Sequence, residues 1–249
     1  MKKLLTTGAF IITSALSGFA HANDINQQLQ AKLDEANYLY ESGRYREALD
    51  IVHWLDEKGV AIDHDFYPVR LGTLLPLWKR LSSSYNPART SYNSKLKVTI
   101  FDTINNPQNC TSYDDTQVML DINGSYDEFI TLLENKEVDY PRVWQRCWDQ
   151  ASTLAAVEHA SKLLIESYLV DLSDHFDSYF VPLIDGLYLQ CSDYDGDEET
   201  ECQDGVKDYL LGISLSYQNA AMIHYGLSEA GSIGGSTLKL LLKWQNVEL

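Results

Sequence analysis

The sequence predicts a mainly α protein, an irregular helical bundle that begins with a helical hairpin. Two observations lead to this prediction. Over most of the chain after residue 22, apolar residues recur at steps of three and four, the spacing of one helix face. Strands that alternate with helices, the pattern of a parallel α/β sheet, are absent. Four cysteines add two predicted disulfides, and the middle of the chain leaves room for a minor β pair.

Residues 1–22 have the layout of a secretory signal peptide. A basic start, Lys2 and Lys3, precedes an apolar stretch that ends at Phe19, and the small-x-small sequence AHA follows. The stretch is shorter and more polar than the roughly 20 apolar residues of a membrane span. We therefore expect cleavage after residue 22, export to the periplasm, and no membrane span after cleavage. Residues 23–249 are then expected to form a single helical domain.

The first two helices are predicted between residues 25 and 59. The segments INQQLQAKLDEANYLYESG and RYREALDIVHWLDEKG each carry apolar residues at helical spacing, and they meet at Gly43. Glycine accepts the left-handed conformation that ends a helix, so two antiparallel helices are expected here.

This hairpin resembles the centre of a tetratricopeptide repeat, in which small and aromatic residues interlock two helices. The matching positions are Ala36, Gly43, Tyr45 and Ala48. The match covers a single repeat, and Lys32 and Val60 depart from the family's pattern. The resemblance implies helical-hairpin packing and protein binding, but not an array of repeats, because no second copy follows.

The following segments are less regular. Residues 64–84 are predicted to be helical with interruptions at Pro68 and Pro76. LKVTIFD and TQVMLDI form either a small strand pair or helices. The capping box SYDE, from Ser125, begins the next helix.

The second half of the chain continues with helices. The stretch RVWQRCWDQASTLAAVEHASKLLIESYLVDL, after Pro141, predicts the strongest helix of the protein. An apolar segment leads into an acidic loop, and a further helix follows from Gly205. Glycine-rich SEAGSIGGST, residues 228–237, is expected to break the chain before a short last helix.

Cysteine usage supports an oxidising compartment. An even number of cysteines in an exported chain predicts two disulfides, and the favoured pairing joins Cys110 to Cys147 and Cys191 to Cys202. A zinc site is disfavoured because no C-x-x-C spacing occurs and no histidine flanks a cysteine closely.

The charge of the chain restricts its partners. Of the 19 basic residues, Lys2 and Lys3 lie in the predicted signal peptide, so 17 bases remain against 36 acids, a net charge of −19. Such a charge repels nucleic acid and anionic membranes and favours metal ions or basic proteins.

The segment CSDYDGDEETECQDG, residues 191–205, concentrates seven carboxylates around two cysteines. Three interpretations remain open. The segment can be a solvent-exposed loop closed by a disulfide, a calcium-binding loop, or an acidic surface that binds a partner. The alternating Asp193, Asp195 and Asp197, with Asp204, are the tentative calcium ligands. Glu198 occupies the place where an EF-hand requires glycine, so the match is partial. The partner-binding residues would be Asp193, Asp195, Asp197, Glu198 and Glu199.

Aromatic residues are the other candidates for partner binding. Tyr38 and Tyr45 lie at the first hairpin, and tyrosine is enriched at the energetic centres of protein interfaces. Core packing is the alternative explanation for such helix-spaced rings.

No catalytic motif occurs in the chain, so we expect a protein that is not an enzyme. GISLS lacks the closing glycine of a nucleophile elbow, and GSIGGST lacks the lysine of a P-loop. In general build the chain resembles the periplasmic immunity partners of secreted antibacterial toxins: a signal peptide ahead of a small, acidic domain. This resemblance implies a protein partner, a toxin with a basic surface, that the chain inhibits by occlusion. The alternative is a calcium-binding envelope protein that uses residues 193–204.

Overall fold

The computed structural model describes residues 27–169 and 171–245, so the predicted signal peptide lies outside the described residues. Within them the protein is helical and no β-strand occurs, which confirms the mainly α prediction. The described residues group into two compact units, 27–129 and 130–245, and the single domain expected for residues 23–249 stays a prediction. Each unit buries apolar side chains of its own.

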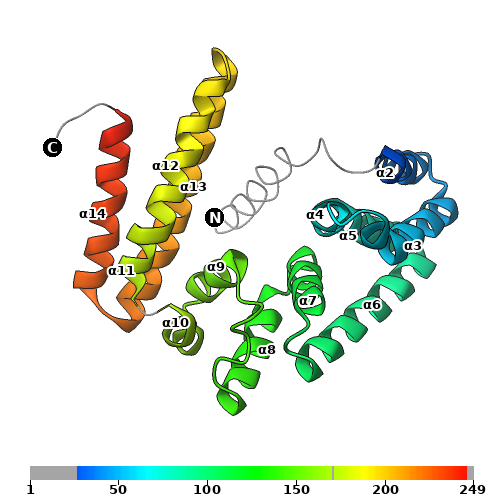
Figure 1. Ribbon diagram of the computed structural model, residues 1–249, viewed down its shortest axis with the longest axis horizontal. Coiled ribbons are helices and arrows are strands. Elements are labelled where there is room, and N and C mark those ends of the chain that lie inside the picture. The colour runs from blue at the N-terminus through cyan, green and yellow to red at the C-terminus, as the bar shows by residue number, and fades with distance from the viewer. Residues whose placement is uncertain (1–26, 170, 246–249) are drawn as a thin grey trace, which may run out of the picture. The chain divides into compact units, whose positions relative to one another are not determined.

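The N-terminal unit begins with the predicted hairpin. Its turn contains Gly43, with a left-handed φ of +74°. The elements are α2 (Gln27–Glu41), α3 (Tyr45–Ile62), α4 (Phe66–Val69), the π-helical turn η1 (Arg70–Leu74), α5 (Leu75–Ser84), α6 (Asn86–Asn105) and α7 (Cys110–Ile122). Their apolar faces meet in one core that includes Leu29, Leu33, Leu55, Phe66, Trp78, Tyr92 and Met119. Figure 1 shows α2 to α7 in blue to green.

Gly59 provides a test of this packing, because it is buried in α3 against the ring of Phe66. A Cβ atom at residue 59 would lie 2.4 Å from Cδ1 of Phe66. Gly59→Ala should therefore lower the free energy of unfolding by about 1–3 kcal/mol through overpacking, although alanine favours helix over glycine by about 1 kcal/mol.

Urea denaturation measures this effect. The matched control is Gly186→Ala on a helix of the other unit, where a new Cβ has no neighbour within 4 Å, so it should be neutral or stabilising. A Gly59→Ala variant as stable as Gly186→Ala would contradict the packing.

The strand alternative for residues 96–102 and 116–122 is wrong, because both segments lie in helices, α6 and α7. Their polar residues decide the outcome. Thr99 and Thr103 are buried four residues apart on α6, and the hydroxyl of Thr103 lies 3.0 Å from that of Thr116 on α7. Residues four apart share one face of a helix. In a strand, Phe101 would lie on the same face as Thr99 and Thr103, but it is 70% exposed while they are buried, so only the helix fits this burial.

The C-terminal unit consists of the end of α8 and the elements that follow it. These are α8 (Tyr126–Asp139), α9 (Gln150–Glu158), α10 (Lys162–Tyr168), α11 (Leu172–His175), the π-helical turn η2 (Phe176–Phe180), α12 (Val181–Gln190), the 3₁₀ turn η3 (Cys191–Asp193), α13 (Asp197–His224) and α14 (Leu227–Trp244). Helix α13 packs along both α12 and α14, in yellow to red in Figure 1.

The single strong helix predicted after residue 141 is replaced by a turn and two shorter helices. Residues 141–147 form turns, and α9 and α10 are separated at Ala160, whose φ is +47°. Local caps explain the interruption. The side chain of Asp149 accepts a hydrogen bond from Ser152 N at 2.8 Å, and Ser161 Oγ accepts one from Leu164 N at 3.4 Å, so each starts a new helix.

The glycine-rich breaker predicted at 228–237 is also wrong, because these residues lie inside α14. Tertiary packing overrides the weak helix propensity of glycine. At Gly234 a Cβ would come within 3.2 Å of the side-chain oxygen of Gln218 on α13, so the absent side chain allows α14 to approach α13 closely.

One run of elements occurs in both units. A four-residue helix, a five-residue π-helical turn and a ten-residue helix follow each other as α4–η1–α5 and as α11–η2–α12. In both, a proline stands at the second position of the ten-residue helix, Pro76 and Pro182. Proline has no N–H for the regular helical hydrogen bond, and the π-helical turn precedes it in each case.

All four cysteines are disulfide-bonded. Cys191 is joined to Cys202, and Cys110 is therefore joined to Cys147, which confirms the predicted pairing. Among the described helices, none is long and apolar enough to cross a membrane.

Candidate binding pocket in the N-terminal unit

A pocket of about 600 Å³ lies among α3, η1, α6 and α7. Charged side chains form much of its lining, and apolar side chains of α6 stand at its side. The charged residues are Asp56, Arg70, Lys95, Asp102, Asp114 and Asp115, and the apolar ones include Val60, Val98 and Phe101. Among these charged residues, four carboxylates against two cations give a net charge of −2.

Arg70 lies at the centre of the charged residues that line the pocket, and the π-helical turn η1 places it there. It is the first residue of η1, in the otherwise apolar stretch before Pro76. The N–H of Leu75 donates to the carbonyl of Arg70, five residues back instead of four. Single π-helical turns inside α-helices frequently occur at functional sites.

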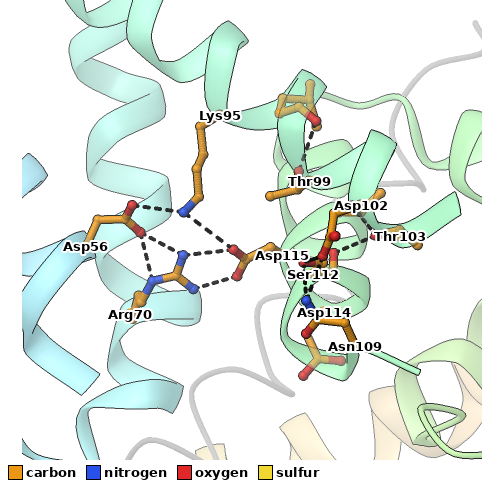
Figure 2. Close-up of polar contacts among 12 residues, drawn as sticks. Asp56, Arg70, Lys95, Thr99, Asp102, Thr103, Asn109, Ser112, Asp114 and Asp115 are labelled. Atoms are coloured by element: carbon orange, nitrogen blue, oxygen red, sulfur yellow. Dashed lines mark hydrogen bonds and ion pairs between the residues drawn. The ribbon is translucent and has the colours of Figure 1, made fainter. Parts of the chain in front are cut away.

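Arg70 holds two aspartates from two other helices (Figure 2). Its Nη1 and Nη2 donate to the two oxygens of Asp115 on α7, at 2.5 and 2.8 Å, and its Nε donates to Asp56 Oδ1 on α3, at 2.8 Å. Lys95 on α6 completes the group with Nζ 3.0 Å from Asp56 Oδ2 and 3.8 Å from Asp115 Oδ2. Four elements are thus joined by one set of ion pairs, called here the Arg70 network.

The Arg70 network is buried at its centre and open at one end. The exposed fractions of Arg70 and Asp115 are 4% and 3%, whereas the side chain of Lys95 is 28% exposed. Burial by itself would lower the pKa of Arg70, but the hydrogen bonds and charges of Asp115 and Asp56 outweigh this effect and raise it above the ordinary value. The guanidinium therefore stays charged.

Two further carboxylates of the pocket are held by neutral donors. Tyr67 donates its hydroxyl to Asp114 Oδ2 at 2.7 Å, and burial together with that carboxylate raises the pKa of Tyr67, so the hydroxyl keeps its proton. Asp102 accepts hydrogen bonds from Ser112 Oγ at 2.5 Å and Asn109 Nδ2 at 2.6 Å. The hydrogen bonds from Ser112, Asn106 and Asn109 hold the pKa of Asp102 below its usual range. Asp102 and Asp114 therefore account for the net negative charge of the pocket.

The apolar side of the pocket is the exposed face of α6. Val98 is 64% exposed and Phe101 is 70% exposed, three residues further along the same helix. Large apolar side chains beside a fixed pattern of charge can bury themselves against an incoming molecule, while the carboxylates receive a cationic group from it.

The predicted partner-binding residues are divided between the two units. In the N-terminal unit, Tyr38 is 65% exposed, but Tyr45 packs between Tyr40 and Tyr85, with ring centroids 5.9 and 6.4 Å away. The ring of Tyr45 is therefore a packing residue, as the alternative interpretation expects. In the C-terminal unit, Asp193, Asp195, Asp197 and Glu198 are exposed and Glu199 is partly buried.

The acidic segment is mostly helical. From Asp197 onward its residues belong to α13, with Asp197, Glu198 and Glu199 in the first turn, where the helix dipole favours negative charge. The tentative calcium ligands Asp193, Asp195, Asp197 and Asp204 do not form a group that could hold a metal ion, and no such group of three or more occurs among the described residues. Asp204 instead pairs with Lys207 at 2.9 Å.

Sequence reasoning did not find the Arg70 network, because its members are far apart in the chain. Arg70 is separated by 45 residues from Asp115 and by 14 from Asp56. One local signal was present: an arginine inside the apolar run PVRLGTLLP must find a buried partner, since burial of an isolated charge is strongly unfavourable.

No protein-family model matches the chain, and no curated protein or solved structure is similar to it.

Proposed function

We propose that the protein is a periplasmic binding protein that neutralises an envelope-targeting antibacterial toxin by occluding it. The observation that carries the proposal is the pocket, where exposed Phe101 and Val98 stand beside carboxylates of fixed position. This combination suits a partner that presents a lysine or arginine next to an apolar patch.

The charges of the pocket favour binding over chemistry. Arg70, Asp56 and Asp115 are held in ion pairs, and Tyr67 keeps its proton. Groups held in this way offer a rigid surface, and rigidity lowers the entropy that is lost on association. The net charge of −19 that remains without residues 1–22, 17 bases against 36 acids, accelerates encounter with a basic partner.

The two disulfides support an oxidising compartment, as does the predicted signal peptide. Occlusion in the periplasm requires export, so the chain should protect a bacterium that carries an envelope-targeting toxin when it has residues 1–22 and not when it lacks them. Equal protection by the form that stays in the cytoplasm would count against the proposal.

A pair of matched variants tests the pocket itself. Phe101→Glu should weaken binding to the toxin by at least about tenfold, because a central apolar contact is lost and a further negative charge enters an acidic pocket. Leu227→Glu is the control, since Leu227 is similarly exposed, at 76% against 70% for Phe101, but lies in the other unit. Calorimetric titration of the toxin into each variant measures the affinities. An equal loss of affinity for both variants would show that the pocket is not part of the interface.

A further inference from the structure

The second half of α13 exposes an apolar stripe on the side opposite its buried face. Leu211, Leu215 and Met222 are 49%, 69% and 46% exposed. Their steps of four and seven residues place them on one helix face, over about 16 Å of helix length. Residues that α13 buries, such as Leu210, Ile213 and Tyr217, alternate with this stripe in the sequence and lie on the other side of the helix.

The first half of the same face is acidic. Asp197, Glu201, Asp204 and Asp208 are all exposed, and they continue the same alternation of four and three residues toward the start of the helix. This half also extends over about 16 Å. The face therefore consists of two blocks, acidic and then apolar, and is called here the two-block face.

Two glycines border the two-block face. Gly205 and Gly212 lie in the interior of α13, seven residues apart, and a Cβ atom on either would have no neighbour within 4 Å. Glycine in a helix interior is unfavourable, and packing among the described residues does not require it at these positions. A helix surface with small residues allows the backbone of a second helix to approach closely.

The acidic block is preorganised as helix. The disulfide between Cys191 and Cys202 ties the beginning of α13 to the end of α12, and carboxylates in the first turn are stabilised by the helix dipole. A partner would meet this face already formed, which lowers the entropy lost on binding.

We infer that the two-block face binds an amphipathic helix of a partner protein, with lysine or arginine in one half of its contact face and large apolar residues in the other. The order of the two blocks along α13 disfavours a second copy of this chain as the partner. A parallel pair of α13 helices would set carboxylates against carboxylates, and an antiparallel pair would set carboxylates against leucines. This inference goes beyond the pocket and concerns the other unit.

The test uses the full chain and two synthetic helical peptides of about three heptads. Both peptides contain the same lysines and leucines on one face. In the first they are grouped in two blocks, and in the second they alternate. Fluorescence anisotropy should show that the block peptide binds at least about tenfold more tightly, because only it matches both halves of the face at once.

Variants of the protein locate the binding site. Leu215→Glu should weaken block-peptide binding by about tenfold or more, while Leu238→Glu, the same change at a leucine 55% exposed on α14, should leave it unchanged. Asp204→Lys should also weaken binding, and this effect should shrink at high salt because the contact is ionic. Phe101→Glu should have no effect, so that failure here and failure of the pocket proposal are distinguishable.

Three outcomes would overturn the inference: equal affinity for the two peptides, an equal loss for Leu215→Glu and Leu238→Glu, or a dimer seen by light scattering that Leu215→Glu dissociates. Thermal melting by circular dichroism checks that each variant is folded. The changed leucines are exposed, so their melting temperatures should stay close to that of the unchanged protein.

Discussion

Replacing Arg70 with methionine is expected to lower the free energy of unfolding by about 3–5 kcal/mol, the range for removing one partner of a buried ion pair. Methionine fills a similar volume, so the loss is one of charge and hydrogen bonds. Asp115 would lose both bonds from the guanidinium, with Lys95 3.8 Å away as its remaining cation. Asp56 would keep its contact to Lys95 at 3.0 Å.

Urea denaturation of matched arginine variants measures this effect. Arg44 on the α2–α3 turn also pairs with a carboxylate, Glu47, but the two side chains are each 53% exposed. Arg44→Met should therefore leave stability close to that of the unchanged protein, because solvent screens an exposed pair. If both variants lost the same stability, the buried position of the Arg70 network would be refuted.

A double variant separates the charge of Asp115 from the packing around it. Arg70→Met combined with Asp115→Leu removes the stranded carboxylate together with its partner. Replacing both members of a buried pair by apolar residues is often neutral, so the double variant should recover part of the stability that Arg70→Met loses. A double variant less stable than either single one would show that the two side chains contribute independently.

Replacing Trp144 with alanine is expected to lower the free energy of unfolding by about 3–5 kcal/mol, the range for a fully buried tryptophan. Trp144 has no exposed surface, and its Nε1 donates to the carbonyl of Leu133 at 3.1 Å. It anchors the turns at residues 141–147. The nearby control is Tyr140→Ala, because Tyr140 is 59% exposed and its loss should change stability little.

A second variant tests the polar contacts beside Trp144. The hydroxyl of Tyr168 accepts a hydrogen bond from Trp144 N at 3.0 Å and donates to the buried Glu137 at 2.6 Å. Burial and Glu137 raise the pKa of Tyr168, so the hydroxyl remains a donor. Tyr168→Phe should lower the free energy of unfolding by about 1–3 kcal/mol, because both partners lose a hydrogen bond inside the protein. Circular dichroism during denaturation measures the stability of Trp144→Ala and of Tyr168→Phe. A Trp144→Ala variant as stable as Tyr140→Ala would contradict the anchoring role of Trp144.

The glycines show how far sequence reasoning reaches. Gly43 lies at a turn between two strong helical patterns, and its left-handed φ follows from the local sequence alone. Gly234 lies in a glycine-rich segment whose composition predicts a break in the helix. It nevertheless lies inside α14, because the side chain of Gln218 on α13 packs against it. Local propensity is a weak prior, and contact with a neighbouring helix reverses it.

The candidate sites differ in the same way. The carboxylates at the start of α13 are neighbours in the sequence, so their clustering was visible at once, and helix formation then placed Asp197, Glu201, Asp204 and Asp208 along one face. The pocket joins α3, η1, α6 and α7, whose charged residues have no common local pattern.

By itself, the sequence determined the helical class, the first hairpin and the strongly acidic character of the chain, and it favoured the disulfide pairing that the structure confirms. These properties follow from periodicity, composition and the spacing of cysteines along the chain. The tertiary structure alone decided that Arg70 holds Asp56 and Asp115, that the segment after residue 141 is broken, and that the glycine-rich segment is helical. The physical reason is that each of these outcomes depends on atoms brought together by packing, which the order of residues along the chain does not specify locally.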